Sequence, residues 1–235
     1  MNPTKYYDKT ASFKKRSLTD GTLDERNAHN FIKSVIIKDY VKKDSVVLDL
    51  GCGKGGDVLK FKFSNIKCYT GVDVSQKSLI VCEQRLQKMG FHYKLFNSDM
   101  WEERGFGNEC YDVVSSQFSL HYSFDCEETA NKTLENVYNS LKKGGYFIGT
   151  IPISETSYEK TKVTIPGHDD VFLEPTVSLP TFMIKLEQHK FKIVKLENFK
   201  TFYENASKTN KELLEKMKAN LFPPKENYHV FVLIK

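Results

Sequence analysis

Long hydrophobic runs are missing from this 235-residue sequence, and its cysteines are few. No stretch approaches the ~18 consecutive apolar residues that a membrane-spanning helix needs, so we expect no membrane span. The N-terminal segment MNPTKYYDKTASFKKRS has no apolar run behind its basic residues, which predicts no secretory signal and a reducing compartment. The cysteines are odd in number, scattered and without a CxxC pair or a histidine at metal-ligand spacing, so we expect reduced thiols and no metal site. They are Cys52, Cys68, Cys82, Cys110 and Cys126.

The composition is typical of a globular protein with one large domain. Hydrophobic residues make up 40% of the chain and charged residues 28%. The net charge of +5 is compatible with a polyanionic partner, but the lysines are spread along the chain. We expect a flexible N-terminal segment at 1–26 and a single domain at 27–235, interrupted by a polar loop or short hairpin at about 153–172. A monomer is the default expectation.

Short apolar segments alternate with helical patterns along most of the chain. This alternation predicts βαβ units, hence an α/β fold with a doubly wound, mostly parallel sheet and helices on both faces. The closing segment YHVFVLI (228–234) is a strand with no helix after it, which we expect to run antiparallel. The other expected strands cover 45–50, 67–73, 92–98, 111–118, 146–152 and 191–199, and the expected helices 27–43, 55–63, 75–89, 127–141, 180–189 and 211–220.

A glycine-rich turn follows the first strand and precedes a helix. Gly51, Gly53 and Gly56 satisfy the pattern G-x-G-x-x-G, whose glycines let the backbone turn sharply and approach a ligand. Asp73 ends the next strand, where an acidic side chain takes the ribose hydroxyls of an adenosine. This pattern alone serves NAD as well as S-adenosylmethionine.

Acidic residues around the turn favour the second cofactor. Asp49 precedes the turn, Asp57 follows it and Asp99 ends the third strand, so all three meet at the carboxyl edge of the predicted sheet. These carboxylates would repel a pyrophosphate. S-adenosylmethionine carries an ammonium and a sulfonium and no phosphate, so it fits them better.

Aromatic residues follow the fourth strand, where an acceptor would meet the cofactor. Phe118, His121 and Tyr122 offer flat faces and polar edges for a heterocycle, although aromatic residues after a strand are by themselves more often core.

Four segments in order resemble the mRNA cap guanine-N7 methyltransferases: RNAHNFIK (26–33), VLDLGCGKGGD (47–57), SSQFSLHYSF (115–124) and LKKGGYFIGTIP (141–152). The segments at 172–182, 199–204 and 228–234 continue the match, which thus covers about 26–235. The resemblance implies a Rossmann-like methyltransferase fold, S-adenosylmethionine as cofactor with S-adenosylhomocysteine as product, and 5′-capped mRNA as substrate.

The resemblance also implies roles for single residues. Family members hold S-adenosylmethionine at the positions of Lys33, Gly51, Asp57, Asp73, Asp99 and Gln117, to which the pattern above adds Asp49 and Gly53. They hold the guanine at His121, Tyr122, Glu174 and Tyr228, beside Phe118, and a cap phosphate at Lys54. Two positions and one segment depart from the family pattern: His29 replaces an asparagine, Trp101 replaces a frequent tyrosine, and the insertion at about 153–172 is shorter than in family members. We expect these two residues to retune cap contacts.

The chemistry explains why no catalytic triad or metal cluster is expected. N7 of guanine is a lone-pair nucleophile with no proton to lose, so in-line displacement at the sulfonium needs no general base. Catalysis then depends on positioning by Glu174, His121 and Tyr122. Positive charge moves from sulfur to the guanine ring, and Glu174 suits the two donor groups of the guanine edge.

Three other functions stay open at this point. They are a methyltransferase for a small molecule, an NAD-dependent oxidoreductase, and a non-catalytic subunit. Without a K-x-D-G motif, the earlier capping steps would belong to other capping enzymes, and the RNA polymerase machinery is a further expected partner. We expect a nuclear protein if the gene is cellular and a cytoplasmic one if it belongs to a cytoplasmic virus or plasmid.

Overall fold

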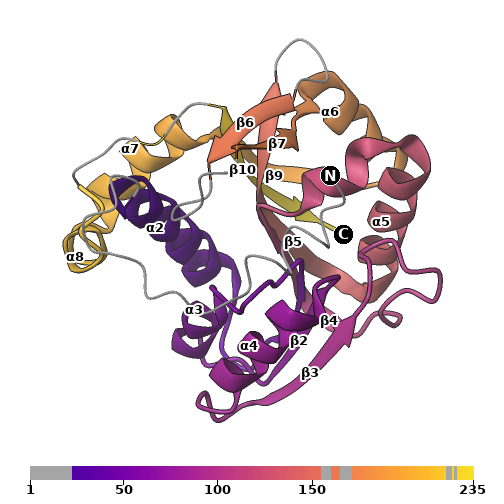
Figure 1. The fold of residues 1–235 in the computed structure, drawn as a ribbon, viewed down its shortest axis with the longest axis horizontal. Coiled ribbons are helices and arrows are strands. Elements are labelled where there is room, and N and C mark those ends of the chain that lie inside the picture. Colours follow the sequence, from indigo (N-terminus) through magenta and orange to yellow (C-terminus); the bar gives the residue numbers. More distant parts are fainter. Residues whose placement is uncertain (1–22, 155–159, 165–170, 221–223, 225–226) are drawn as a thin grey trace.

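An eight-stranded sheet organises the described part of the chain (Figure 1). The computed structural model describes residues 23–154, 160–164, 171–220, 224 and 227–235, with the backbone alone for 160–164 and 171–174. The strands of this sheet are β1 (Val46–Leu50), β2 (Cys68–Asp73), β3 (His92–Asn97), β4 (Tyr111–Gln117), β5 (Leu141–Ser154), β8 (Val177–Ser178), β9 (Lys192–Asn198) and β10 (Tyr228–Ile234).

The strand order is β3-β2-β1-β4-β5-β10-β9, with β8 paired to β5. The pairs from β3 to β5 are parallel, whereas β10 runs antiparallel to both β5 and β9. From β1 the chain adds β2 and β3 on one side, and then returns to add β4 and β5 on the other side of β1. The carboxyl ends of β1 and β4 therefore lie side by side at a topological switch point, where ligands bind in such folds. The prediction of a Rossmann-like doubly wound sheet with an antiparallel C-terminal strand is confirmed.

Helices cover both faces of the sheet, because successive strand residues point to opposite sides. Val47 packs in the core beneath the helices of one face and Leu48 in the core of the other. The first face carries α2 (Leu23–Tyr40), α3 (Val58–Phe63), α4 (Gln76–Leu86), α7 (Phe199–Thr209) and α8 (Lys211–Lys216). The second carries α5 (Glu127–Ser140) and α6 (Leu179–Gln188), as Figure 1 shows.

Several elements differ from the expected boundaries. The helix expected over 27–43 is α2, which begins four residues earlier, at Leu23, and ends at Tyr40; Asp24 and Glu25 in the first turn favour this start electrostatically. Helix α7 and the 3-10 helix η1 (Leu120–Asp125) were not predicted. The segment expected as a loop or hairpin forms an antiparallel pair, β6 (Lys160–Thr164) with β7 (Val171–Pro175).

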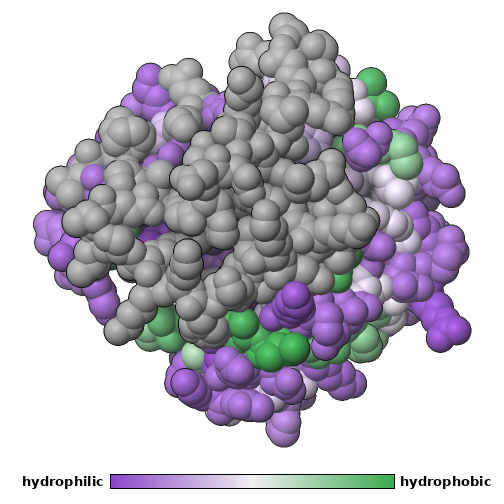
Figure 2. Space-filling view, viewed as in Figure 1, coloured by the Kyte–Doolittle hydropathy of each residue, from purple (hydrophilic) through white to green (hydrophobic). Residues whose placement is uncertain are grey.

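The described surface is mainly hydrophilic on the face shown in Figure 2, with a hydrophobic area in the lower middle of the view. Within the described residues, no helix is long and apolar enough to cross a membrane.

Candidate active site

A glycine loop, residues 51–57, turns the chain from β1 into α3. Gly51 and Gly53 adopt positive φ angles of +70° and +53°, which favour glycine. A Cβ on Gly51 would lie 2.3 Å from the Cβ of Ser119, so this position has no room for a side chain. By contrast, Gly53 and Gly56 have open space where a Cβ would lie. The loop therefore leaves room beside these two glycines for a ligand.

Asp73 binds the glycine loop directly. Its Oδ2 accepts a hydrogen bond from the Gly53 amide at 2.8 Å, and its Oδ1 accepts one from the Ser75 amide at 2.9 Å. The carboxylate thus joins the loop to the start of α4, which Ser75 caps as predicted. Asp73 lies at the carboxyl end of β2, beside the loop, where the sequence places it.

A buried ion-pair network ties α2 to the end of the glycine loop. Lys33 Nζ lies 2.9 Å from the Asp57 carboxylate, and Lys60 Nζ lies 2.5 Å from it. Lys60 also donates to Asn30 Oδ1 at 3.1 Å. Burial alone would raise the pKa of Asp57, but the two ammonium groups outweigh burial and lower this pKa to about 2. Lys60 was missed in the sequence, although it lies three residues after Asp57 on the helical side of the loop.

Asp49 lies behind the loop inside the sheet. It is 3% exposed, and Tyr69 donates its hydroxyl to Asp49 Oδ2 at 2.8 Å. Burial, together with the Asp57 charge, raises the pKa of Asp49 to about 7. The structure thus corrects the charge argument: Asp57 is neutralised by lysines and Asp49 is buried, so these two carboxylates oppose a pyrophosphate less than the sequence suggested.

Two further predicted cofactor residues lie at neighbouring strand ends. Asp99 follows β3 and is partly buried; burial and, second, Glu102 raise the pKa of its carboxyl. Gln117 ends β4, where its Oε1 accepts from Thr150 Oγ1 at 3.2 Å and its Nε2 donates to Ser115 Oγ at 3.3 Å. The structure therefore brings the ends of β1, β2, β3 and β4 to one edge, as predicted.

Four aromatic rings, from α2, α7, β10 and the turn that follows β4, meet beside Lys33; we call them the aromatic cluster. Their ring centroids are 5.2 to 5.8 Å apart in all six pairs. Lys33 Nζ lies 5.7 Å from the centroid of one ring, that of Phe118. Three members were predicted from the sequence, and Phe199, at the start of α7, was not. The cluster consists of His29, Phe118, Phe199 and Tyr228.

His121 and Tyr122 pack against each other in η1, with ring centroids 4.1 Å apart and ring planes tilted by 40°. His121 is fully buried, and burial lowers the pKa of its imidazole to about 3, so the ring is neutral at physiological pH. Such a ring can donate or accept a hydrogen bond but carries no charge.

The remaining predicted substrate residues lie around these groups. Glu174 belongs to β7, pairs with Thr161 and lies on a strand beside η1, but its side chain is outside the described part of the structure. Lys54 is half-buried in the glycine loop. Trp101 packs against the core of the α5 and α6 face, so the structure does not bring it into the aromatic cluster.

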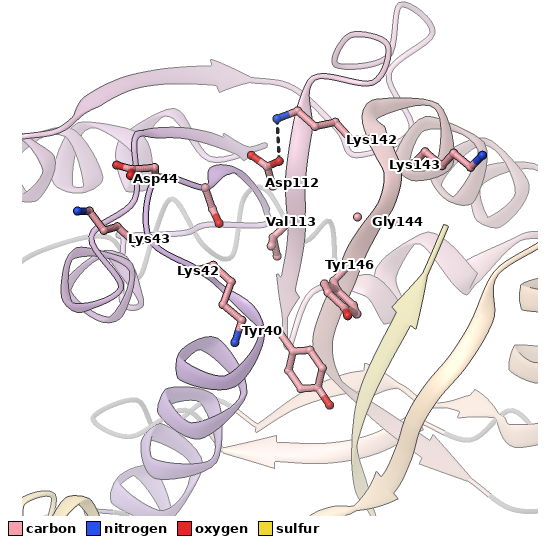
Figure 3. A pocket seen from close by; sticks show the side chains of 12 residues that line it. Tyr40, Lys42, Lys43, Asp44, Asp112, Val113, Lys142, Lys143, Gly144 and Tyr146 are labelled. Atoms are coloured by element: carbon pink, nitrogen blue, oxygen red, sulfur yellow. Dashed lines mark hydrogen bonds and ion pairs between the residues drawn. The ribbon is translucent and has the colours of Figure 1, made fainter.

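A pocket of about 330 Å³ lies at the opposite edge of the sheet (Figure 3). It is formed where β1, β4 and β5 begin, and Lys142 pairs there with Asp112 at 2.7 Å. Lys42, Lys43 and Lys143 also line it. This pocket contains none of the predicted site residues.

Solved structures share this fold at low sequence identity. The 1,6-didemethyltoxoflavin-N1-methyltransferase of Burkholderia thailandensis, with bound S-adenosylhomocysteine, superposes with a TM-score of 0.62 at 17% identity over 88% of this chain and 78% of that one. An S-adenosylmethionine-dependent methyltransferase of Mesorhizobium loti gives a TM-score of 0.62 at 17% identity over 91% and 100%. The fold is therefore that of the S-adenosylmethionine-dependent methyltransferases.

Sequence similarity narrows the class. Residues 4–170 match the mRNA (guanine-N(7))-methyltransferase domain, and the chain belongs to this family. The mRNA cap guanine-N(7) methyltransferase of Saccharomyces cerevisiae is 42% identical over 141 residues, which cover 55% of this chain and 32% of that protein. The corresponding protein of Caenorhabditis briggsae is 30% identical over 244 residues, covering 82% and 65%. The chain thus spans about a third of the yeast relative's length.

Proposed function

We propose that this chain transfers a methyl group from S-adenosylmethionine to N7 of the guanine cap of mRNA. Family membership carries the proposal, and the glycine loop, the Lys33–Asp57 network and the aromatic cluster, gathered at one edge of the sheet, support it. When bound, S-adenosylmethionine supplies an electrophilic methyl group on a sulfonium. The chain's own residues then have to bind, orient and exclude water.

The cofactor side fits this ligand. The open space beside Gly53 and Gly56 admits a ligand next to the backbone, and Asp73 is held at the end of β2, where it can take the ribose hydroxyls. We propose that Lys33, Asp57, Asp99 and Gln117 complete this side. Asp49 then has an indirect role, as a buried carboxyl beneath the glycine loop that supports its position.

The acceptor side combines flat rings and polar edges. We propose that Phe118, His121 and Tyr228 border the guanine, with His29 tuning the aromatic cluster and Tyr122 beside it. Glu174 would accept hydrogen bonds from the guanine N1–H and 2-amino group, and Lys54 would contact a cap phosphate. Trp101 would border the cap from the α5 side.

No residue has to move a proton in this mechanism. N7 has a free lone pair, and the neutral His121 needs no change of protonation state. The protein instead holds donor and acceptor close and collinear, a contribution that can reach several kcal/mol. Positive charge appears on the guanine as the bond forms, and a carboxylate at the guanine edge then stabilises the transition state more than the ground state.

The decisive test is methyl transfer from radiolabelled S-adenosylmethionine to the dinucleotide GpppG. We expect transfer of label to GpppG. In the matched control, m7GpppG, we expect no label on the methylated guanine, because its N7 is already occupied. Transfer to neither, with S-adenosylhomocysteine raising the Tm, would favour a small-molecule acceptor, the alternative suggested by the toxoflavin-precursor enzyme that shares the fold. A Tm raised by NAD instead would indicate an oxidoreductase.

We also propose that capped mRNA is bound by a monomer that works with separate capping enzymes. The place of action would be the nucleus for a cellular gene and the cytoplasm for a cytoplasmic virus or plasmid. Sedimentation of the purified chain and localisation of a tagged copy test these two points.

A further inference from the structure

The hydroxyl of Ser119 joins the two halves of the candidate active site. Ser119 lies between Phe118 of the aromatic cluster and η1, and it is 7% exposed. Its Oγ donates to the carbonyl oxygen of Leu50 at 2.7 Å. Leu50 is the last residue of β1 and directly precedes the glycine loop. One buried hydrogen bond therefore links the cofactor side to the acceptor side.

The direction of this hydrogen bond follows from the donors available. A carbonyl oxygen only accepts, so the single hydroxyl hydrogen of Ser119 goes to Leu50. Ser116 Oγ lies 2.7 Å from Ser119 Oγ, and Ser116 must therefore be the donor of that second bond. Ser116 is fully buried in β4. The relay runs from Ser116 through Ser119 to Leu50.

Backbone pairing does not duplicate this connection. The register of β1 and β4 ends at Asp49 and Ser115, one residue before Leu50. Past that point the chain turns at Phe118, whose φ is +57°, and the turn brings Ser119 back onto β1. The Ser119 side chain then fills the space in which Gly51 would carry a Cβ.

We propose that Ser119 is a positioning residue that sets the separation between the glycine loop and the turn at 118–119, which leads into η1, during methyl transfer. The inference rests on the proposed function and adds a residue that has no expected contact with either ligand. In-line displacement depends steeply on the distance and angle between donor and acceptor, and a misplacement of about 1 Å can cost roughly a hundredfold in rate. The Ser119–Leu50 hydrogen bond connects the two segments and therefore acts on that distance.

The test compares Ser119→Ala with Ser123→Ala in the full chain. Ser123 is a matched control, because it is also buried and its hydroxyl donates, within η1, to the carbonyl oxygen of Leu120 at 2.8 Å, with no bond to β1. Four quantities are measured for each: kcat on GpppG, KM for GpppG, Kd for S-adenosylhomocysteine, and Tm. We expect Ser119→Ala to lower kcat by roughly tenfold to a hundredfold, with both affinities and Tm close to those of Ser123→Ala.

Ser116→Ala provides a second variant in case Ser119→Ala does not fold. It removes the donor to Ser119 but leaves the bond to Leu50, so a smaller fall in kcat is expected. Equal kcat in the Ser119→Ala and Ser123→Ala variants overturns the positioning role, as does a fall in kcat that merely follows a loss of cofactor affinity. Absence of transfer by the wild type is a different result: it overturns the proposed function itself.

Discussion

The ammonium of Lys33 lies 2.9 Å from the carboxylate of Asp57, across the gap between α2 and the glycine loop. Lys60 approaches the same carboxylate from α3, so a single acidic group holds two lysines from different helices. Both lysine side chains are largely buried, at 13% and 12% exposure. Removing one partner of a buried pair leaves uncompensated charge, which commonly costs about 3–5 kcal/mol.

We therefore expect Asp57→Asn to lower the free energy of unfolding by several kcal/mol at pH 7 and to weaken binding of S-adenosylhomocysteine. The pKa of Asp57 is depressed to about 2, so its contribution is present above pH 4 and is lost as the pH falls towards 2. Urea unfolding at pH 7 and pH 3 should show that the free energy of unfolding falls less between these two pH values in the variant than in the wild type. Glu135→Gln, which breaks a surface pair with Lys132, is the control and should change little.

Asp49 should produce the opposite pH dependence. Burial raises the pKa of its carboxyl to about 7, so between pH 4 and 7 the folded protein keeps a proton that the unfolded chain has lost. Stability from this group therefore declines as the pH rises through that window. Asp49→Asn keeps an acceptor for Tyr69 and should raise the free energy of unfolding at pH 8 by up to roughly 3–4 kcal/mol, with little gain at pH 4.

Tyr69→Phe sharpens the Asp49 test. The Tyr69 hydroxyl stabilises the ionised carboxylate, so its loss should raise the pKa of Asp49 further and extend the decline in stability to higher pH. Parallel pH profiles for the wild type and Asp49→Asn would contradict the assignment.

Much of the fold was predictable because its signals are local. Apolar strands alternating with helical patterns predict the parallel sheet, and Ser75 caps α4 as its position suggests. The missed helix α7 also had a local signal: Asn198 is an N-cap whose side chain accepts from Thr201 at 2.9 Å, and apolar residues follow at helical spacing. Helix η1 lacks a side-chain cap and ends after six residues, so it gave no such signal.

The sequence was enough to predict which residues of the site lie at the strand ends, but not which side chains they contact. The glycine loop and Asp73 follow from the order of elements, since parallel strands deliver their carboxyl ends to one edge. Whether Asp57 faces a ligand or two lysines depends on how α2 packs over the loop, a long-range contact between positions 33 and 57. The burial of His121 and the arrival of Phe199 in the aromatic cluster are likewise set by tertiary packing.

Phe199 should affect substrate binding as well as stability. It is fully buried and contacts the three other rings of the aromatic cluster. Phe199→Ala should cost about 3–5 kcal/mol of stability. Each lost ring contact is worth about 0.5–1.5 kcal/mol, so KM for GpppG should rise by roughly twofold to tenfold if the cluster borders the guanine.

Phe182→Ala is the matched control for this experiment. Phe182 is also fully buried, but it packs on Phe124 and Phe231 in the core of the other face. The Phe182→Ala variant should lose comparable stability while its KM for GpppG stays unchanged. KM is measured well below the melting temperatures of both variants. The same KM in both variants would remove the aromatic cluster from the acceptor site.

Two glycines of one loop should separate folding from binding. Both Gly51 and Gly53 have positive φ, so alanine at either position carries a conformational cost of about 1–2 kcal/mol. At Gly51 the new Cβ would also meet Ser119 at 2.3 Å, whereas at Gly53 it would enter open space. Gly51→Ala should therefore lower Tm far more than Gly53→Ala, and it should break the Ser119–Leu50 bond.

Gly53→Ala should instead weaken S-adenosylhomocysteine binding at a modest cost in Tm, because its methyl group would enter the open space in which we propose that the cofactor binds. The clash at Gly51 can be relieved in its partner: combining Gly51→Ala with Ser119→Gly removes the Cβ that the new methyl meets. The double variant should then be more stable than Gly51→Ala alone, which differential scanning calorimetry measures directly. Strict additivity of the two substitutions would mean that Gly51 and Ser119 do not compete for the same space. The close packing on which the positioning role of Ser119 rests would then be contradicted.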